Sequence, residues 1–356
     1  MRIDADAHVD ETEATWQYMT GRDERYRPTT AALGEELYRP ATAPATGRAD
    51  RQWCIGELRL RRPIRDYLRS AVSPTSGQLL DVGERLRHLD ELRIDVQVLY
   101  PTTFIRSSFY GHQEEELALT RSYNRWLADR TELSGGRLRW IAVLPLGSMQ
   151  EAVSELKWAR DHGACGIFKK GLECGERRAD DEYFFPLYEA ASALDVPICI
   201  HTGSEGLGKL RPTALDAVQA FEPIVTSGVL ERYPLLRVGF IEAGASWVPF
   251  ALASLAGTQR HTHLQALDPN LTVTIDRELF RRTRLYVACF SHDDLPYLLT
   301  FGLEESLLVG TDYTHQDQSA ELVVLDRIEE RAKSGEITAA VANKIVNDNP
   351  RRFYGL

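Results

Sequence analysis

The chain lacks the features of membrane-bound, secreted and nucleic-acid-binding proteins. Its 356 residues contain no run of about 18 apolar residues, the length that a membrane-spanning helix requires. The N-terminal MRIDADAHVDE is acidic almost from its start and has no apolar core of a secretory signal. The net charge of −10 leaves no basic excess for nucleic acid or anionic lipid. We therefore expect a cytoplasmic protein that binds neither a membrane nor nucleic acid.

Cysteine is scarce, and its spacing does not suggest a disulfide framework. The chain has 5 cysteines, an odd number, and no Cys-x-x-Cys pair occurs. Most of them lie in apolar, strand-like runs, where cysteine packs as a small hydrophobic residue. The cysteines predict a reducing compartment.

The first apolar run is not followed by Gly-x-Gly-x-x-Gly, so the dinucleotide crevice of an open doubly wound sheet is not indicated. The chain instead alternates short apolar runs with longer amphipathic stretches, a pattern typical of βα units. We predict strands at 2–8, 95–100, 138–146, 165–169, 197–201, 236–242, 285–290 and 306–312, and helices that include 114–132, 149–162, 183–194, 213–231 and 246–256. About eight such pairs predict a (β/α)8 TIM barrel that comprises residues 1–356 as one domain.

A long segment after the first strand does not fit this alternation. Residues 10–83 are rich in proline, threonine and arginine, and residues 53–60 are typical of part of a small hairpin. Because a compact domain rarely holds so long a loop without a purpose, we predict a lid or rim insertion here.

Metal-type ligands stand at the ends of three predicted strands. Asp6 and His8 share one face of the first strand, because side chains alternate along a strand. His201 and Asp312 each end another strand, at the edge where barrels build their active sites. Alone, each has a plainer explanation: a chance Asp-x-His pair, a buried core histidine or a helix N-cap. Together they predict a site for one divalent metal ion, with zinc first and manganese or iron as alternatives.

With these residues in place, the sequence resembles the amidohydrolase superfamily, in the amidohydrolase 2 branch related to aminocarboxymuconate-semialdehyde decarboxylase. The resemblance spans almost the whole chain and rests on IDADAHVDE, RIDVQVLYPT, ICIHTG, RYPLLRVGFIEAGASWVP, VGTDYTHQD and NDNPRRFYGL. It implies a metal held by Asp6 and His8 after strand one, His201 after strand five and Asp312 after strand eight. It also implies a homodimer.

The sequence departs from the family's decarboxylases at two positions. Asp6 stands where many members have histidine, which leaves the identity of the metal open. Glu242 stands after strand six, where the decarboxylases usually carry a histidine. On this ground we expect a hydrolase that acts on a small amide, lactone or related carbonyl compound. A metal-activated water would be the nucleophile, with Asp312 as its proton acceptor and Glu242 as base or orienting residue.

Two other functions remain open at this point. The same ion could chelate a substrate carboxylate, and the alternative is therefore a non-oxidative decarboxylase of a small unsaturated or aromatic carboxylic acid. A barrel that had become a binding or scaffold protein would show a broken ligand set, whereas all four positions hold competent residues.

Further candidates lie near the same predicted rim. His315 is expected to contact a ligand or the substrate, and otherwise to cap its loop. Four more side chains are candidates for contact with a small-molecule substrate, with plain structural roles as the alternative, namely Tyr100, Arg106, Lys169 and His292.

Overall fold

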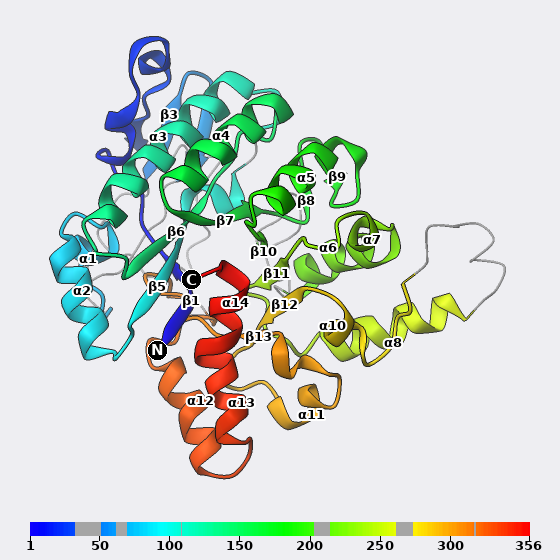
Figure 1. The fold of residues 1–356 in the computed structure, drawn as a ribbon. Coiled ribbons are helices and arrows are strands. Elements are labelled where there is room, and N and C mark those ends of the chain that lie inside the picture. Colours follow the sequence, from blue (N-terminus) through cyan, green and yellow to red (C-terminus); the bar gives the residue numbers. More distant parts are fainter. Residues whose placement is uncertain (33–50, 62–69, 108, 203–213, 261–272, 317) are drawn as a thin grey trace.

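The computed structural model describes residues 1–32, 51–61, 70–107, 109–202, 214–260, 273–316 and 318–356. Eight parallel strands stand side by side in chain order and form the central sheet (Figure 1). They are β1 (Ile3–His8), β5 (Val96–Tyr100), β6 (Leu138–Ala142), β7 (Ala164–Lys169), β10 (Ile198–His201), β11 (Val238–Ile241), β12 (Leu285–Ala288) and β13 (Leu307–Leu308). Their residues are almost all buried, as expected for strands covered on both faces.

The sheet closes where the chain beyond β13 runs beside β1. Ala5 N donates to the carbonyl of Val309 at 3.0 Å, and Asp312 N donates to the carbonyl of Asp6 at 2.9 Å. Gly310 makes this close approach feasible, since a Cβ there would lie 2.3 Å from the Cβ of Asp6. The closed eight-stranded arrangement confirms the predicted TIM barrel.

Helices surround the strands (Figure 1). The longer ones are α2 (Val82–Glu91), α3 (Gln113–Glu132), α4 (Met149–Asp161), α5 (Phe185–Ala193), α6 (Ala214–Thr226), α8 (Val248–Gln259) and α12 (Val324–Lys333). The shorter α-helices are α1 (Pro74–Gly77), α7 (Val229–Arg232), α10 (Leu279–Arg282), α11 (Leu295–Leu299), α13 (Ala339–Asn343) and α14 (Asn349–Tyr354). Several begin at a side-chain cap; the Ser148 hydroxyl, for example, accepts from the backbone N–H of Glu151.

Single turns complete the helical elements. They are η1 (Thr15–Tyr18), η2 (Gly21–Tyr26), η4 (Thr103–Arg106), η5 (Glu182–Phe184), η6 (Leu303–Glu305) and η7 (Lys344–Asp348), the last of them a π-helix. The predicted helix at 213–231 is divided into α6 and α7, because Gly228 adopts a φ of 81° that ends a right-handed helix. Its first residue lies outside the described residues.

The segment after β1 carries a small sheet of its own. Strands β2 (Thr29–Ala32), β3 (Arg51–Ile55) and β4 (Leu58–Arg61) pair antiparallel, and β3 and β4 form the predicted hairpin. Trp53 of β3 is fully buried and its ring meets that of Trp16 edge-on at 5.8 Å. Parts of the predicted insertion, 33–50 and 62–69, lie outside the described residues. Its role as a lid and the assignment of one domain stay predictions.

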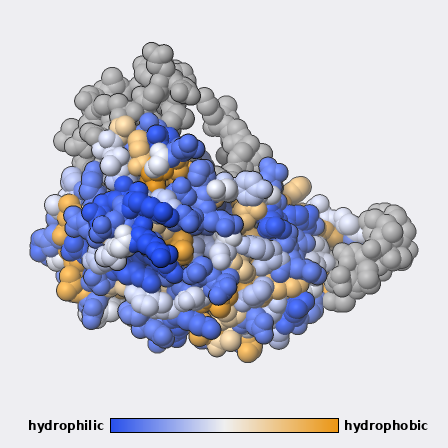
Figure 2. Space-filling model, turned by 90° about the horizontal axis from the view of Figure 1, so that it is seen from above, coloured by the Kyte–Doolittle hydropathy of each residue, from blue (hydrophilic) through white to orange (hydrophobic). Residues whose placement is uncertain are grey.

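The described surface and helices are those of an ordinary barrel. Figure 2 shows a face that is mostly hydrophilic, with apolar residues in small separate groups. None of the described helices combines the length and apolar character needed to cross a membrane. A short two-stranded sheet, β8 (Leu172–Glu173) with β9 (Arg177–Arg178), follows β7 at the edge of the barrel.

Candidate metal centre

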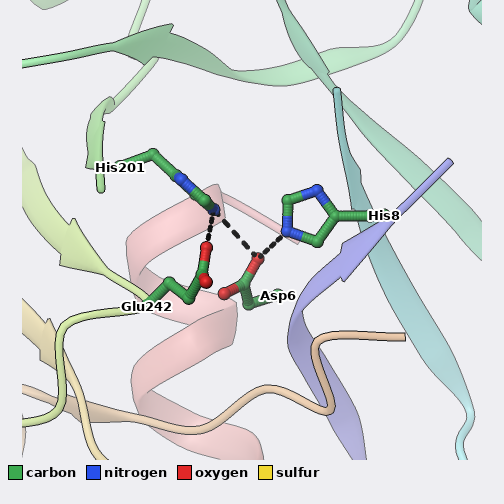
Figure 3. A group of neighbouring side chains, drawn as sticks. All are labelled: Asp6, His8, His201 and Glu242. Atoms are coloured by element: carbon green, nitrogen blue, oxygen red, sulfur yellow. Dashed lines mark ion pairs between the residues drawn. The ribbon is translucent and has the colours of Figure 1, made fainter. Parts of the chain in front are cut away.

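Four side chains converge from the carboxyl ends of three barrel strands, of which β10 and β11 are adjacent and β1 is not (Figure 3). Asp6 and His8 project from β1, His201 ends β10, and Glu242 directly follows β11. The Nε2 atoms of His8 and His201 lie 3.5 and 3.8 Å from Oδ1 of Asp6. All four side chains are buried, and one ligand atom from each lies within 4.8 Å of the others. The structure thus brings together three of the four sequence-predicted ligands and adds Glu242 beside them.

Asp312 and His315 complete the site from the segment after β13. Oδ1 of Asp312 lies 3.2 Å from Nε2 of His8 and 2.7 Å from Nδ1 of His315. The His315 ring stacks on the His8 ring with centroids 3.8 Å apart. His8, Glu242, Asp312 and His315 form a second group with metal-binding spacing, which shares His8 and Glu242 with the first.

The donor atoms of this cluster fit a divalent cation. Nδ1 of His8 lies 2.8 Å from the Pro101 carbonyl, and Nδ1 of His201 lies 3.1 Å from the Thr202 carbonyl. Each carbonyl can accept an N–H only, so each ring presents the lone pair of Nε2 to the centre. These two Nε2 atoms and Oδ1 of Asp6 are buried and have no hydrogen-bond partner among the described residues. Because buried polar atoms are rarely left without partners, the three atoms indicate a ligand site.

The cluster also couples charges strongly. Burial disfavours the charged form of Asp6, but contact with His201 and His8 lowers the pKa of its carboxyl overall. Burial likewise opposes the charged form of His8, yet Asp312 and Asp6 raise its pKa. The carboxylates therefore favour protonated imidazoles in the metal-free site, and a bound cation would displace these protons.

Two acidic residues of the site have backbone conformations that are rare outside glycine. Glu242 has a φ of 58° and Asp312 a φ of 50°. Such left-handed residues cost free energy and cluster at functional sites, where the surrounding structure imposes them. Both residues lie after the carboxyl ends of their strands and are buried in the cluster.

Ser319 connects these two carboxylates. Its Oγ lies 3.0 Å from Oε1 of Glu242 and 2.9 Å from Oδ2 of Asp312. Burial, and next the charge of Asp312, raises the pKa of Glu242 to about 8. Since one hydroxyl proton cannot serve two carboxylates, the arrangement favours a protonated carboxyl at Glu242. Sequence reasoning missed Ser319, which lies in a loop and belongs to no motif.

A second buried polar network lies one step deeper in the barrel. Asp4 accepts from Thr311 N at 2.8 Å, from Thr311 Oγ1 at 2.5 Å and from Gln97 Nε2 at 2.7 Å. Arg85 donates from Nε to Oε1 of Gln97 at 2.7 Å and from NH2 to the carbonyl of His8 at 3.2 Å. The strand pattern did place Asp4 on the face of Asp6 and His8, but nothing in the sequence predicted its partners.

The remaining candidate residues lie apart from the cluster or are engaged in other contacts. The Tyr100 hydroxyl is buried 2.7 Å from that of Tyr354. Nζ of the buried Lys169 pairs with Oε2 of Glu173 at 2.6 Å. His292 is exposed and stacks on Phe290, and the side chain of Arg106 lies outside the described residues. The proposed substrate contacts of these four residues stay predictions, and the geometry of Tyr100 and Lys169 favours structural roles.

Comparison with known proteins identifies the family. The family model described as Amidohydrolase (Amidohydro_2) matches residues 82–356. The chain belongs to the amidohydrolase family. This amidohydrolase is 25% identical over 293 residues to 2-amino-3-carboxymuconate-6-semialdehyde decarboxylase of Dictyostelium discoideum, covering 78% of this chain and 77% of that protein. It is 25% identical over 187 residues to gamma-resorcylate decarboxylase of a Polaromonas species, covering 46% of this chain and 56% of that protein.

Solved structures agree on the fold. An amidohydrolase from Mycobacterium avium superposes with a TM-score of 0.77 at 18% identity and covers 100% of this chain and 98% of its own. A 5-carboxyvanillate decarboxylase from Novosphingobium aromaticivorans, complexed with manganese, gives a TM-score of 0.68 at 18% identity, covering 100% and 96%. These likenesses support the barrel.

The relatives correct one prediction. We expected hydrolysis because Glu242 replaces the usual histidine, whereas the curated relatives that match this enzyme are decarboxylases. The prediction of a hydrolase is therefore wrong. Its physical premise fails as well, because a buried Glu242 with a pKa of about 8 can carry a proton at neutral pH, as a histidine can.

Proposed function

We propose that this enzyme is a metal-dependent, non-oxidative decarboxylase of a small aromatic or unsaturated carboxylic acid. The observation that carries the proposal is the buried cluster of Asp6, His8 and His201, whose inward atoms have no hydrogen-bond partner among the described residues. The decarboxylase relatives support the reaction class.

We assign the metal to Asp6, His8, His201 and Asp312. Two carboxylates and two imidazoles suit a borderline cation such as manganese, which is present in a structurally similar decarboxylase. We therefore place manganese before zinc, contrary to the order expected from the sequence. When bound, the ion would chelate the substrate carboxylate and oppose the negative charge that develops as carbon dioxide leaves.

Decarboxylation also needs a proton for the carbon that loses the carboxylate. The bond from that carbon to the carboxylate breaks, and the electron pair remains on the carbon until a proton joins it. Glu242 is the proton donor in this proposal, because Ser319 lies within hydrogen-bond distance of both it and Asp312. His315, 2.7 Å from Asp312, holds that carboxylate in position.

Paired assays test the reaction. Purified protein loaded with manganese or with zinc is incubated with a panel of hydroxybenzoates and unsaturated acids, and separately with lactones and amides. The proposal predicts stoichiometric release of carbon dioxide from at least one acid and no hydrolysis. Hydrolysis without carbon dioxide release would contradict it. The Asp6→Ala chain serves as the metal-site control and should show neither bound metal nor turnover.

The homodimer and the cytoplasmic location implied at the outset stay predictions. Light scattering during gel filtration would decide the first, since a dimer of this chain has twice the 40.2 kDa of one protomer.

A further inference from the structure

Glu11 lies three residues beyond His8 in the first motif of the chain and is not part of the metal cluster described above. Its side chain is buried, with 2% of its surface exposed. Oε1 accepts from the backbone N–H of Thr102 at 3.0 Å. Oε2 accepts from the backbone N–H of Thr103 at 2.9 Å and from its hydroxyl at 2.8 Å. Both oxygens of this carboxylate are therefore bonded to the turn that follows β5.

These bonds begin where the backbone pairing of β1 with β5 ends. The backbone N–H of Val9 donates to the carbonyl of Tyr100 at 3.2 Å, just past the paired ends of the two strands. Pro101 follows and has no N–H to donate. The next two N–H groups are those of the two buried threonines, and buried N–H groups need an acceptor. Glu11 supplies that acceptor from a position about 90 residues earlier in the chain.

The turn that Glu11 holds contacts two rings of the metal centre. The Pro101 carbonyl accepts from Nδ1 of His8 at 2.8 Å, and Oγ1 of Thr102 lies 3.4 Å from Nε2 of His315. These two rings stack with centroids 3.8 Å apart. Since the carbonyl fixes the tautomer and the rotation of the His8 ring, a displaced turn would direct Nε2 of His8 away from the centre.

We propose that Glu11 is a positioning residue of the metal centre, whose carboxylate holds residues 101–103 so that the Pro101 carbonyl orients the His8 ring. Glu11 acts through the turn, because its oxygens bond to the two threonines. The inference rests on the metal assignment of the proposed function and deepens it. It adds a residue that bonds to none of the four ligand side chains within the described part of the chain.

Competition with a chelator measures the effect on the dissociation constant for manganese. Glu11→Ala should weaken manganese binding about 10- to 100-fold, the scale of a lost contact to a metal-ligating histidine. Glu11→Gln retains one acceptor oxygen of the same length and should restore part of the affinity. A purely structural role would give no such graded loss of metal affinity at temperatures where every variant is folded.

Glu155 of α4 provides the matched control. It is also a buried acid, 4% exposed, and accepts from Nδ2 of Asn124 at 2.8 Å in the helical layer. Glu155→Ala should lower the unfolding temperature, because it leaves a buried donor without its acceptor. Its dissociation constant for manganese should equal that of wild type.

A second readout needs no metal. In metal-free protein labelled with ¹⁵N at histidine, the Nδ1–H of His8 should exchange slowly with solvent, because it is buried and bonded to the Pro101 carbonyl. The loss of its signal in His8→Ala assigns it. Exchange should be about tenfold faster or more in Glu11→Ala, where the turn opens more readily, and unchanged in Glu155→Ala.

Three results would overturn the proposal. They are equal manganese affinity in Glu11→Ala and wild type, equal losses of affinity in Glu11→Ala and Glu155→Ala, or exchange of the His8 Nδ1–H that does not respond to Glu11. If Glu11→Ala does not fold, Glu11→Gln decides, and wild-type values in both measurements would reject the role. If wild type itself binds no manganese, the metal assignment fails, and the exchange rates still decide whether Glu11 orients His8.

Discussion

Asp4 and Asp6 stand two residues apart on the same face of β1, both buried, yet their surroundings are opposite. Both carboxylate oxygens of Asp4 accept hydrogen bonds from Thr311 or Gln97. Oδ1 of Asp6 has no such donor and faces two imidazole nitrogens instead. A buried carboxylate that accepts hydrogen bonds at both oxygens has a structural role. A buried carboxylate that lacks such donors can bind a cation instead.

The deeper network therefore positions the outer cluster. Arg85 holds the His8 carbonyl, and Asp4 holds the backbone N–H of Thr311, the residue before Asp312. Buried hydrogen bonds thus hold the backbone at His8 and next to Asp312, two of the proposed ligands. Metal ligation depends on such outer contacts nearly as much as on the ligands themselves.

The largest expected effect comes from removal of one of the proposed metal ligands. His201→Ala should abolish stoichiometric metal binding and activity while the unfolding temperature of the metal-free protein stays close to wild type. Among the described residues, the replacement removes one hydrogen bond, which Nδ1 of His201 donates to the Thr202 carbonyl. Elemental analysis and thermal unfolding measure the two outcomes. The exposed His162 provides the control, and its replacement by alanine should leave the metal content unchanged. Full metal content in His201→Ala would disprove the ligand assignment.

A smaller loss of activity is expected when Glu242, the proposed proton donor, is replaced. Glu242→Gln should retain the metal and lower kcat by about 100-fold, the scale of a lost general acid. Ser319→Ala should lower kcat less, and the double variant should be no worse than Glu242→Gln, because both act on one proton. Additive losses in steady-state assays would separate Ser319 from that role.

The contrast between Asp4 and Asp6 is tested by the change that each replacement makes in the free energy of unfolding. Asp4→Ala leaves buried donors of Thr311 and Gln97 without an acceptor and should cost about 3 kcal/mol in the free energy of unfolding. Asp6→Ala, measured metal-free by urea denaturation, should cost less than Asp4→Ala, because Oδ1 of Asp6 accepts no hydrogen bond among the described residues and the replacement removes only its ion pairs with His8 and His201. Equal costs would show that the two carboxylates do not differ in the way proposed.

Glu116 lies between Asp4 and Asp6 in the hydrogen bonds that its carboxyl accepts, and its effect on stability is expected to depend on pH. Its carboxyl accepts one backbone N–H, from Gly147, and burial raises its pKa from 4.5 to about 7, aided by Glu173 and opposed by Gly147 and Lys170. A pKa raised on folding contributes stability that is fully present below pH 4.5 and is lost as the pH rises through 7. Wild type should therefore lose about 3 kcal/mol relative to Glu116→Gln between these limits.

Unfolding measured across this pH range checks the difference. The exposed Glu132 serves as the control, and Glu132→Gln should follow wild type at every pH. Parallel curves for wild type and Glu116→Gln would mean that Glu116 titrates near its ordinary value.

The residues of the sequence alone predicted the barrel and the grouping of the proposed ligands. The ends of strands can be recognised in the sequence because apolar runs stop at polar residues. Parallel strands in a barrel have their carboxyl ends at one rim. Asp6, His8, His201 and Asp312 could therefore be grouped in advance, although the structure shows β13 as two residues where a strand at 306–312 was predicted. Motif resemblance named the family, whereas the departure from the family pattern at Glu242 led to the wrong reaction.

Only the tertiary structure decided which polar residues are satisfied and which are not. That Asp4 is bonded by Thr311, that Ser319 bridges Glu242 to Asp312, and that Glu11 accepts from Thr102 and Thr103 are facts about residues far apart in the chain. Strand periodicity fixes the face on which a side chain lies, whereas its partners come from segments brought close by barrel closure. The sequence therefore contains the proposed ligands of the site, and folding determines their environment.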